Sequence, residues 1–312
     1  MNVLITSVAR KVWLVEAFRR AVAPLGGRVL AADADPLAVG LRLADAAVDL
    51  PRQDDPGFEA ALLGACADKD IRLIVPTRDG ELAWFAARRA RLSEAGVAVM
   101  VAAPEVIALC QDKRAFAEHC LDAGFDVAAV APTRQAAPLP AFARPRRGAG
   151  GRGAGRVEDA ATLARLEPWD EWVVQPIVEA PEYTIDLFAD FAGEVLSVAP
   201  RQRLRVVAGE SVVGVTVEAP RLVERAVDLA RSLGLVGHNT LQAFWEGGEP
   251  LWIEVNPRYG GGAALGFAAG ADTPAMLVKL AAGQPVAPRI GDYERGLYMY
   301  RYGVDHFTRD AA

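Results

Sequence analysis

Residues 241–258 read LQAFWEGGEPLWIEVNPR, two apolar runs around a glycine-containing segment, which is the pattern of a β-hairpin. Glu254 and Asn256 are two residues apart, so both lie on one face of the second strand, and the apolar residues between and before them lie on the other. A three-residue turn at 247–249 places Gln242 opposite Glu254, whereas a two-residue turn would place it opposite Ile253. We predict the three-residue turn.

This hairpin has the composition of a metal site. Gln242, Glu254 and Asn256 would bring amide and carboxylate oxygens to one face. Oxygen ligands suit Mg²⁺ or Mn²⁺, and Mg²⁺ usually binds together with substrate phosphates. The hairpin therefore predicts a divalent-metal site in an enzyme that handles phosphates.

A second candidate segment is RPRRGAGGRGAG, residues 144–155, which contains the letters Gly148-x-Gly150-x-x-Gly153. In a dinucleotide fold such glycines follow a core strand directly and open a helix. Here a proline and two arginines precede Gly148, and the helical pattern starts only near Val157. We interpret the segment as a phosphate-binding loop, whose backbone N–H groups and four flanking arginines close over a triphosphate. A flexible surface loop is the alternative on this stretch alone.

The first 100 residues alternate short apolar runs with helical patterns, which predicts a parallel sheet covered by helices on both faces. The turn after the first run, residues 6–10, has no glycine, so binding of NAD there is not expected. Residues 104–124 predict one or two short helices, and residues 157–166 a helix. Residues 182–218 predict antiparallel strands, and residues 220–235 an amphipathic helix.

Composition narrows the class of protein. The chain has 312 residues, 52% of them apolar, and a net charge of −6 with scattered basic residues, so nucleic acid is not expected as a partner. No apolar run is long enough to span a membrane and no signal peptide is recognised, so we expect a cytoplasmic protein. The three cysteines form no CxxC pair, and we expect free, buried thiols.

The order of these motifs resembles the ATP-grasp superfamily. The matching pieces are Asp112-Lys113, FARP with its glycine-rich loop, VVQPIVEAPEYTID, LQAF and WIEVNPRYGGG. The chain looks most similar to short, stand-alone relatives of the carbamoyl phosphate synthetase large chain. The resemblance implies an α/β fold, α+β in its ATP-binding part. It would have a Rossmann-like pre-ATP-grasp lobe (1–105), a small ATP-grasp subdomain with a lid loop (106–173) and a central subdomain with the metal site (174–312).

The resemblance also implies roles for single residues. Arg144, Gln175 and Gln242 stand where many members have lysine, glutamate and aspartate, and Arg144 and Gln242 match the carbamoyl phosphate synthetase branch. Adenine would be held by Gln175 and the backbone of Ile177 and Val178, and the ribose by Glu182. Arg258 would stabilise the transferring phosphate, assisted by Arg203. The implied ATP-binding residues are Lys113, Arg144, Gly148, Gly150, Gly151, Gly153, Gln175, Ile177, Val178 and Glu182, the metal ligands Gln242, Glu254 and Asn256, and the catalytic residues Arg258 and Arg203.

Other interpretations of these residues stay open at this point. Lys113 could be an ordinary exposed helix residue, and Glu182 a solvated strand acid. Alternation along the strand puts Arg201, Arg203 and Arg205 on one face, which could equally be a solvated face.

The activity implied by the resemblance is an ATP- and Mg²⁺-dependent ligation of a carboxylate to an amine or a thiol. It would proceed through an acyl phosphate and release ADP and phosphate to join small-molecule substrates. A kinase acting on a carboxylate or hydroxyl, carbamoyl phosphate synthesis with a partner protein, and a nucleotide-binding regulatory module remain alternatives. Homodimers are common among relatives and leave no signature in this sequence.

Overall fold

The computed structural model describes residues 1–148 and 150–309. Its N-terminal lobe contains a five-stranded parallel sheet in the order β3-β2-β1-β4-β5. The strands are β1 (Asn2–Thr6), β2 (Val29–Ala32), β3 (Ala46–Ala47), β4 (Ile71–Pro76) and β5 (Ala98–Val99). The helices of this lobe are α1 (Val12–Val22), η1 (Ala23–Leu25), α2 (Val39–Leu43), α3 (Phe58–Asp68) and α4 (Asp79–Glu94).

Helices cover both faces of this sheet, as predicted. Leu4 of β1 packs in a cluster with Leu62 of α3 and Phe85 of α4. Its neighbour Ile5 packs in a second cluster with residues of α1, including Phe18. Because successive side chains of a strand point to opposite faces, this split shows that the sheet is buried on both sides.

Two helices lead out of this lobe, α5 (Pro104–Cys110) and α6 (Lys113–Asp122). Asp112 caps α6, since its side chain accepts hydrogen bonds from the backbone N–H groups of Arg114 and Ala115 at 3.1 and 3.2 Å. The cap fixes the start of α6 and therefore the direction in which Lys113, its first residue, leaves the backbone.

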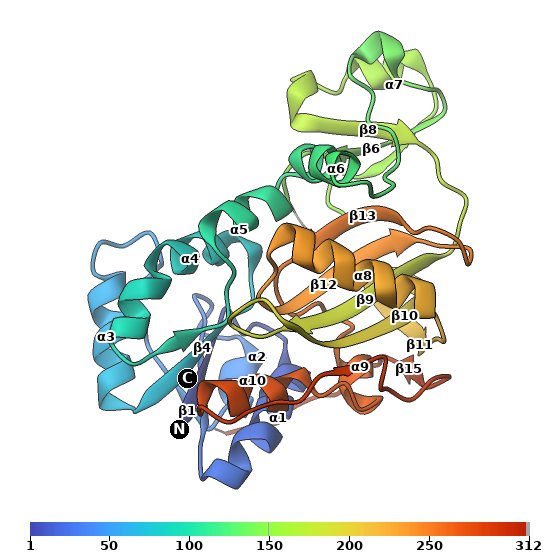
Figure 1. Ribbon diagram of the computed structural model, residues 1–312. Helices are drawn as coiled ribbons and strands as arrows, with labels where there is room; N and C mark the ends of the chain where they lie inside the picture. The colour runs from blue at the N-terminus through green and yellow to red at the C-terminus, as the bar shows by residue number, and fades with distance from the viewer. Residues whose placement is uncertain (149, 310–312) are drawn as a thin grey trace.

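A small antiparallel sheet, in the order β7-β6-β8, projects from the body of the molecule together with α7 (Figure 1). The elements of this part are η2 (Arg134–Ala136), β6 (Ala141–Pro145), β7 (Gly155–Val157), α7 (Ala160–Ala164), η3 (Trp169–Glu171) and β8 (Trp172–Pro176). The helix predicted to start near Val157 is wrong there, because Val157 pairs with Ala141 in the sheet. The helix begins only at Ala160, where Asp159 caps it.

The largest sheet has seven strands, in the order β13-β12-β9-β10-β11-β15 with β14 paired to β10. Its strands are β9 (Glu182–Ala189), β10 (Val195–Val207), β11 (Glu210–Thr216), β12 (Gly237–Phe244), β13 (Leu251–Asn256), β14 (Arg289–Ile290) and β15 (Tyr298–Tyr300). The accompanying helices are α8 (Pro220–Leu233), α9 (Ala264–Ala268) and α10 (Thr273–Ala281). The three sheets lie in three sequence regions, and we propose the division at about residues 105 and 173 as the domain organisation, with the second boundary moved past β8, which belongs to the small sheet.

The β12–β13 hairpin places Gln242 opposite Glu254, but not through the predicted turn. The strands end at Phe244 and Leu251, which pair with each other, so the connection runs over residues 245–250. Continued without interruption, that register would bring Gln242 opposite Ile253. A register shift between Gln242 and Ala243 restores the expected pair. The pairing was therefore predicted correctly from an incorrect turn, because a β-bulge supplied the missing residue.

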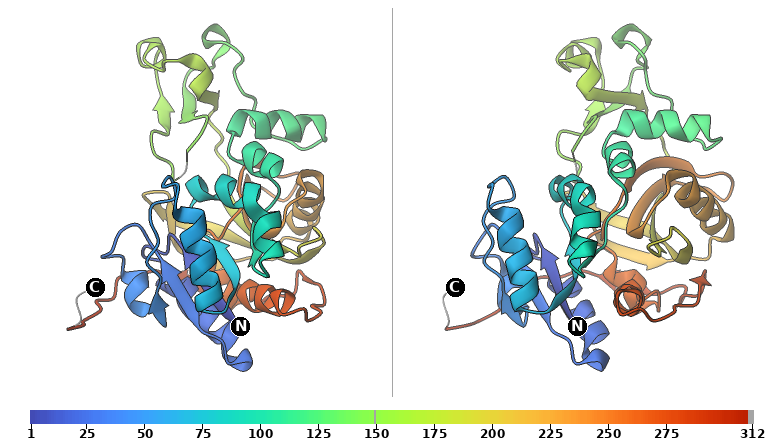
Figure 2. Two further views of the ribbon diagram at one scale, coloured as in Figure 1. Left: turned by 90° about the vertical axis from the view of Figure 1, so that its left-hand side faces the viewer. Right: turned by 60° about the vertical axis from the view of Figure 1, so that its left-hand side comes forward.

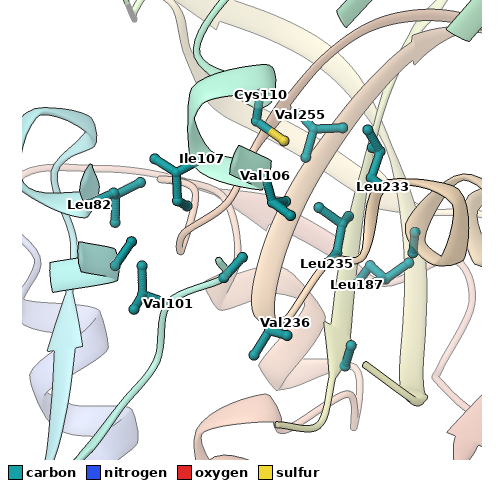
Figure 3. Packing of buried hydrophobic residues seen from close by; sticks show 14 of the residues in the cluster. Leu82, Val101, Val106, Ile107, Cys110, Leu187, Leu233, Leu235, Val236 and Val255 are labelled. Atoms are coloured by element: carbon teal, nitrogen blue, oxygen red, sulfur yellow. The ribbon is translucent and has the colours of Figure 1, made fainter. Parts of the chain in front are cut away.

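One hydrophobic cluster joins the N-terminal lobe to the large sheet, and α5 lies at its centre. Figure 3 shows Cys110 of α5 beside Val255 of β13, with Leu82 of α4 on the opposite side of the helix. The cluster of the small sheet is separate and contains no residue of α5 or α6. Figure 2 shows the same arrangement from two further directions, with the small sheet standing apart from both other sheets. All three cysteines are free and buried, as predicted.

No helix within the described residues is long and apolar enough to cross a membrane.

Candidate active site

Glu254 lies at the centre of a compact polar cluster on the β12–β13 hairpin. Its side chain is 21% exposed, and its Oε2 lies 4.0 Å from Lys113 Nζ and 3.7 Å from an Arg144 guanidinium nitrogen. Its Oε1 accepts a hydrogen bond from Asn256 Nδ2 at 3.0 Å. The cluster therefore joins α6, the small sheet and the large sheet around one carboxylate.

The two cations beside Glu254 are largely withdrawn from solvent. Lys113 and Arg144 are 9% and 8% exposed, so Lys113 is not the ordinary surface residue that its helix position allowed. Burial lowers the pKa of both groups, while the Glu254 carboxylate opposes this effect. Arg144 also donates to the backbone oxygen of Ile253 at 3.0 Å, and its Nε has no partner among the described residues. Two partly desolvated cations facing the same space favour an anion there.

Gln242 lies opposite Glu254 on the paired strand, and together with Asn256 these residues form the predicted metal site. In the amide orientation that satisfies both neighbours, Gln242 Nε2 donates to Glu254 Oε1 at 2.8 Å and Gln242 Oε1 accepts from Arg203 at 2.8 Å. The side-chain oxygens of Gln242, Glu254 and Asn256 are of the amide and carboxylate kinds that Mg²⁺ accepts. The residues thus fit the predicted metal, with Lys113 and Arg144 nearby to balance phosphate charge.

Arg203 lies next to this cluster, between strands of the large sheet. Its side chain is 7% exposed and forms an ion pair with Glu182, while another guanidinium nitrogen donates to the backbone oxygen of Gly209 at 2.8 Å. Glu182 is therefore not a solvated strand acid. The two residues expected to serve ribose and phosphate bind each other in this structure.

Arg201 and Arg203 share one face of β10, as predicted, because their pairing with β11 is regular from Arg201 to Arg203. Arg201 is 2% exposed and donates to Asp186 at 2.9 Å, whereas Arg205 is exposed. Register shifts after Arg203 and after Arg205 interrupt the alternation beyond Arg203, so the prediction fails only for Arg205. Only Arg203 reaches the candidate site.

The glycine-rich loop lies above the cluster. Its four glycines at 148, 150, 151 and 153 all have positive φ angles, which glycine adopts without strain. Lys113 Nζ donates to the backbone oxygen of Gly148 at 2.7 Å. A Cβ atom on Gly209 would come within 2.7 Å of the Gly150 oxygen, so this loop meets the β10–β11 turn closely. Ala149, within the loop, lies outside the described residues.

Two of the loop arginines have a different role from the one predicted. Arg146 Nε donates to both carboxylate oxygens of Asp112 at 2.8 Å, and Arg147 donates to the same carboxylate at 2.8 Å. Burial alone would raise the pKa of Asp112, but the hydrogen bonds from Arg146 and from the backbone lower it overall. Arg146 and Arg147 therefore tie the loop to the start of α6, and only Arg144 of the group faces Glu254.

The residues expected around adenine lie at the end of β8. Gln175 is buried, and its Nε2 donates to the backbone oxygen of Ala128 at 2.6 Å. Ile177 and Val178 follow in the extended segment that joins the small sheet to β9 at Glu182. This segment connects β8 of the small sheet with β9 of the large sheet, which begins at Glu182.

Sequence reasoning missed Asp79, the first residue of α4. Arg258 binds it with two hydrogen bonds of 2.8 and 2.6 Å and also contacts Asn256 Oδ1 at 3.4 Å. The two side chains come from different lobes, 179 residues apart. In the sequence, Asp79 is only an acid in the first turn of the helix after β4. Such acids are common there because they stabilise the amino end of a helix, so this position alone does not indicate a functional site.

Glycines beyond Arg258 allow the following loop to pack closely. A Cβ atom on Gly260 would come within 2.6 Å of Thr240 Oγ1, and one on Gly262 within 2.5 Å of an Arg201 guanidinium nitrogen. The loop that carries Arg258 is therefore held against the large sheet.

Comparisons with known proteins give the following matches. A family described as the N-terminal domain of PylC-like proteins matches residues 3–100. A second family, described as ATP-grasp in the biosynthetic pathway with Ter operon, matches residues 169–300. No curated protein sequence matches significantly.

Solved structures with the same fold cover most of the chain. The biotin carboxylase domain of Hydrogenobacter thermophilus 2-oxoglutarate carboxylase, with MgADP, ADP and bicarbonate, is 18% identical with a TM-score of 0.71, over 95% of this chain and 73% of that one. Campylobacter jejuni biotin carboxylase in a β,γ-ATP complex is 16% identical with a TM-score of 0.73, and the match covers 95% of this chain and 74% of that one. An ADP complex of N5-carboxyaminoimidazole ribonucleotide synthetase is 14% identical with a TM-score of 0.71, and the match covers 92% of this chain and 78% of that one.

Proposed function

Because the chain belongs to the ATP-grasp superfamily, we propose that it is an ADP-forming ligase that joins a small carboxylic acid to an amine through an acyl phosphate. The observation that carries this proposal is the Glu254 cluster, in which one carboxylate faces two buried cations and has two amides beside it on the paired strands. Such a set can neutralise a triphosphate and a divalent cation together.

In the proposed reaction a carboxylate oxygen of the acid attacks the γ-phosphorus of ATP, and the bond to the bridging oxygen breaks as ADP leaves. The amine then attacks the acyl carbon, and the carbon–oxygen bond to phosphate breaks. The product is an amide, with phosphate released and the amine proton passed to solvent. No residue of the protein needs to form a covalent intermediate.

The protein's residues act by position and charge in this scheme. We propose that Lys113 and Arg144 bind ATP phosphates, that the glycine-rich loop covers them through its backbone N–H groups, and that Gln175, Ile177, Val178 and Glu182 hold the nucleoside. Gln242, Glu254 and Asn256 would hold Mg²⁺, which supplies charge neutralisation on the phosphates when bound. Arg258, assisted by Arg203, would stabilise the transferring phosphate.

The proposal is tested by phosphorus NMR on the protein with Mg-ATP, pooled amino acids and small carboxylic acids, with and without hydroxylamine as a trap for acyl phosphates. We expect ADP, inorganic phosphate and a hydroxamate. A stable new phosphate ester without matching free phosphate would identify a kinase instead. Tight binding of Mg-ATP with no ADP formed from any acid would contradict the ligase assignment.

Removing Asp79 tests its contact with Arg258. We expect Asp79→Ala to lower kcat about 10-fold while KM for ATP stays within about a factor of two, because a loosened Arg258 is misplaced mainly in the transition state. Steady-state kinetics of ADP release measures both constants. Asp68→Ala, at an exposed position at the end of α3, is the control. An unchanged or increased kcat in Asp79→Ala would show that Asp79 does not position Arg258.

A further inference from the structure

The parallel sheet of the N-terminal lobe has a topological switch point beside the candidate active site. In the order β3-β2-β1-β4-β5, the connections from β1 and from β4 proceed to opposite sides of the sheet. Ligands of open α/β sheets bind in the crevice outside the carboxyl ends of the strands at such a point. Here the crevice is bordered by the segments after β1 and β4, and Asp79 in the second segment contacts Arg258.

The segment after β1 is held in an unusual conformation. Ser7 and Ala9 have φ angles of 49° and 46°, in the left-handed region that costs a non-glycine residue about 1 kcal/mol or more. Thr77, directly after β4, fixes the segment through its hydroxyl, which lies 2.7 and 2.8 Å from the backbone oxygens of Thr6 and Ser7. Backbone strain that is maintained by surrounding contacts is a feature of binding sites.

The acids in this crevice already have hydrogen-bond donors. Glu81 accepts from the backbone N–H groups of Thr77 and Arg78 at 2.7 and 3.0 Å and from the Ser7 hydroxyl at 2.8 Å. Asp33 accepts from the N–H group of Ala9 at 2.7 Å. Asp79 is engaged by Arg258. These carboxylates shape the two segments through their hydrogen bonds, and their negative charge acts on Lys11 without a direct ion pair.

The cations of the crevice are not paired in the same way. Lys11 Nζ donates to the backbone oxygen of Ser7 at 2.8 Å, and Arg78 Nε lies 3.4 Å from the Ser7 hydroxyl. Within the described residues, neither side chain has a carboxylate oxygen within 4.0 Å. Burial and the nearby Arg258 lower the pKa of Lys11, while Glu81, Asp33 and Asp79 oppose this shift. Lys11 and Arg258 therefore act on the same space.

Arg78 is exposed and brings a further cation close to Ser7, which Lys11 also contacts. A Cβ atom on Gly80 would come within 2.3 Å of an Arg78 guanidinium nitrogen, so the guanidinium lies over the first turn of α4. The amino end of a helix is itself positive, and a cation there is unfavourable unless negative charge is close. Asp79 and Glu81, both in that turn, offset this charge, but their oxygens are engaged by Arg258, Ser7 and backbone N–H groups, and neither forms an ion pair with Arg78. A ligand anion would complete the arrangement.

We infer that Lys11 and Arg78 bind an anionic group of the acid substrate, separate from the carboxylate that is phosphorylated next to Arg258. This inference rests on the proposed function and narrows the substrate to small acids with a second anionic group, a carboxylate or a phosphate. Guanidinium and ammonium groups suit both kinds of anion.

Calorimetric titration of the protein saturated with Mg-ADP tests the inference. The probes are propionate and butyrate as single anions, succinate and glutarate as dicarboxylates, and phosphoglycolate as a phosphorylated acid. We expect at least one doubly anionic probe to bind on the order of 10-fold more tightly than the single anions. Lys11→Met and Arg78→Gln should each remove that preference. Lys69→Met and Arg72→Gln make the same charge changes at exposed positions away from the crevice and should retain it.

The outcomes distinguish a carboxylate from a phosphate as the second anionic group, and they separate this inference from the ligase proposal. Preference for a dicarboxylate identifies a carboxylate as the second group, and preference for phosphoglycolate identifies a phosphate. Equal binding of all probes, or a preference that survives in both variants, would overturn the inference. Since binding is read without turnover, these results do not depend on the hydroxamate assay, whose failure would contradict the ligase proposal alone.

Discussion

Replacing Glu254 with alanine is expected to lower the rate of ATP-dependent hydroxamate formation on the order of 10³-fold. The carboxylate is the only negative group close to both Lys113 and Arg144 among the described residues, and it receives a hydrogen bond from the Asn256 amide. Its loss would leave the metal site with neutral donors alone and the two cations without their counter-charge. The rate is measured at saturating Mg-ATP, with circular dichroism to confirm folding.

Two further variants make this experiment specific. Glu246→Ala removes an exposed acid from the connection of the same hairpin and should leave the rate unchanged. Glu254→Gln keeps the shape and hydrogen bonding but removes the charge, and we expect it to resemble Glu254→Ala. Near wild-type activity in Glu254→Gln would show that the carboxylate charge is not needed, and the metal assignment would fail.

Replacing Asp186 with alanine should have the largest effect on stability. Asp186 and Arg201 form an ion pair with side chains only 2% and 3% exposed, and His238 Nε2 lies 3.7 Å from Asp186. Removing one partner leaves a buried, uncompensated charge, which costs about 3–5 kcal/mol of unfolding free energy. Denaturant unfolding measures this change, provided that the transition remains two-state.

The control for this variant is an exposed ion pair. Asp54 lies 3.3 Å from Arg52, and both side chains are 76% exposed, so solvent screens the interaction. Asp54→Ala should alter the unfolding free energy far less than Asp186→Ala. If the two variants lost equal stability, the buried pair would contribute no more than a surface contact.

The same aspartate predicts a pH dependence. Burial alone would raise the pKa of Asp186, but Arg201 and His238 lower it to about 2. A carboxyl group with a lowered pKa stabilises the fold above its ordinary pKa near 4, and this contribution disappears as the pH falls towards 2. The difference in unfolding free energy between wild type and Asp186→Asn should therefore shrink between about pH 4 and pH 2. A constant difference across that range would contradict the lowered pKa.

Much of the fold followed from the sequence because its signals are local. Alternating strand and helix patterns predicted the parallel sheet, and the paired apolar runs around residues 241–258 predicted the hairpin. The predictions failed where β-bulges interrupt the regular alternation of side chains along a strand. The shifts beside Gln242 and Arg203 depend on neighbouring strands, and counting along one strand cannot reveal them.

The site was predictable only where its residues lie in recognisable motifs. Glu254, Asn256 and Lys113 were found this way, and the structure brings them together. Asp79 and Lys11 were not, because Asp79 contacts Arg258, and Lys11 feels its charge, only after the fold brings distant parts of the chain together. Arg146 and Arg147 show the opposite error, since a basic run near glycines looked like a phosphate ligand but binds Asp112.

The separate hydrophobic cluster of the small sheet has a mechanical consequence. Continuous packing through α5 makes the N-terminal lobe and the large sheet one body, which keeps Asp79 and Arg258 in fixed relation. The small sheet shares no such packing, so it can tilt as a unit on its connecting segments without opening either core. Nucleotide entry would then require breaking polar contacts, such as those of Arg144 with Ile253, of Lys113 with Gly148 and of Arg146 and Arg147 with Asp112, but no hydrophobic core. Hydrogen exchange should show the small sheet opening independently of the rest.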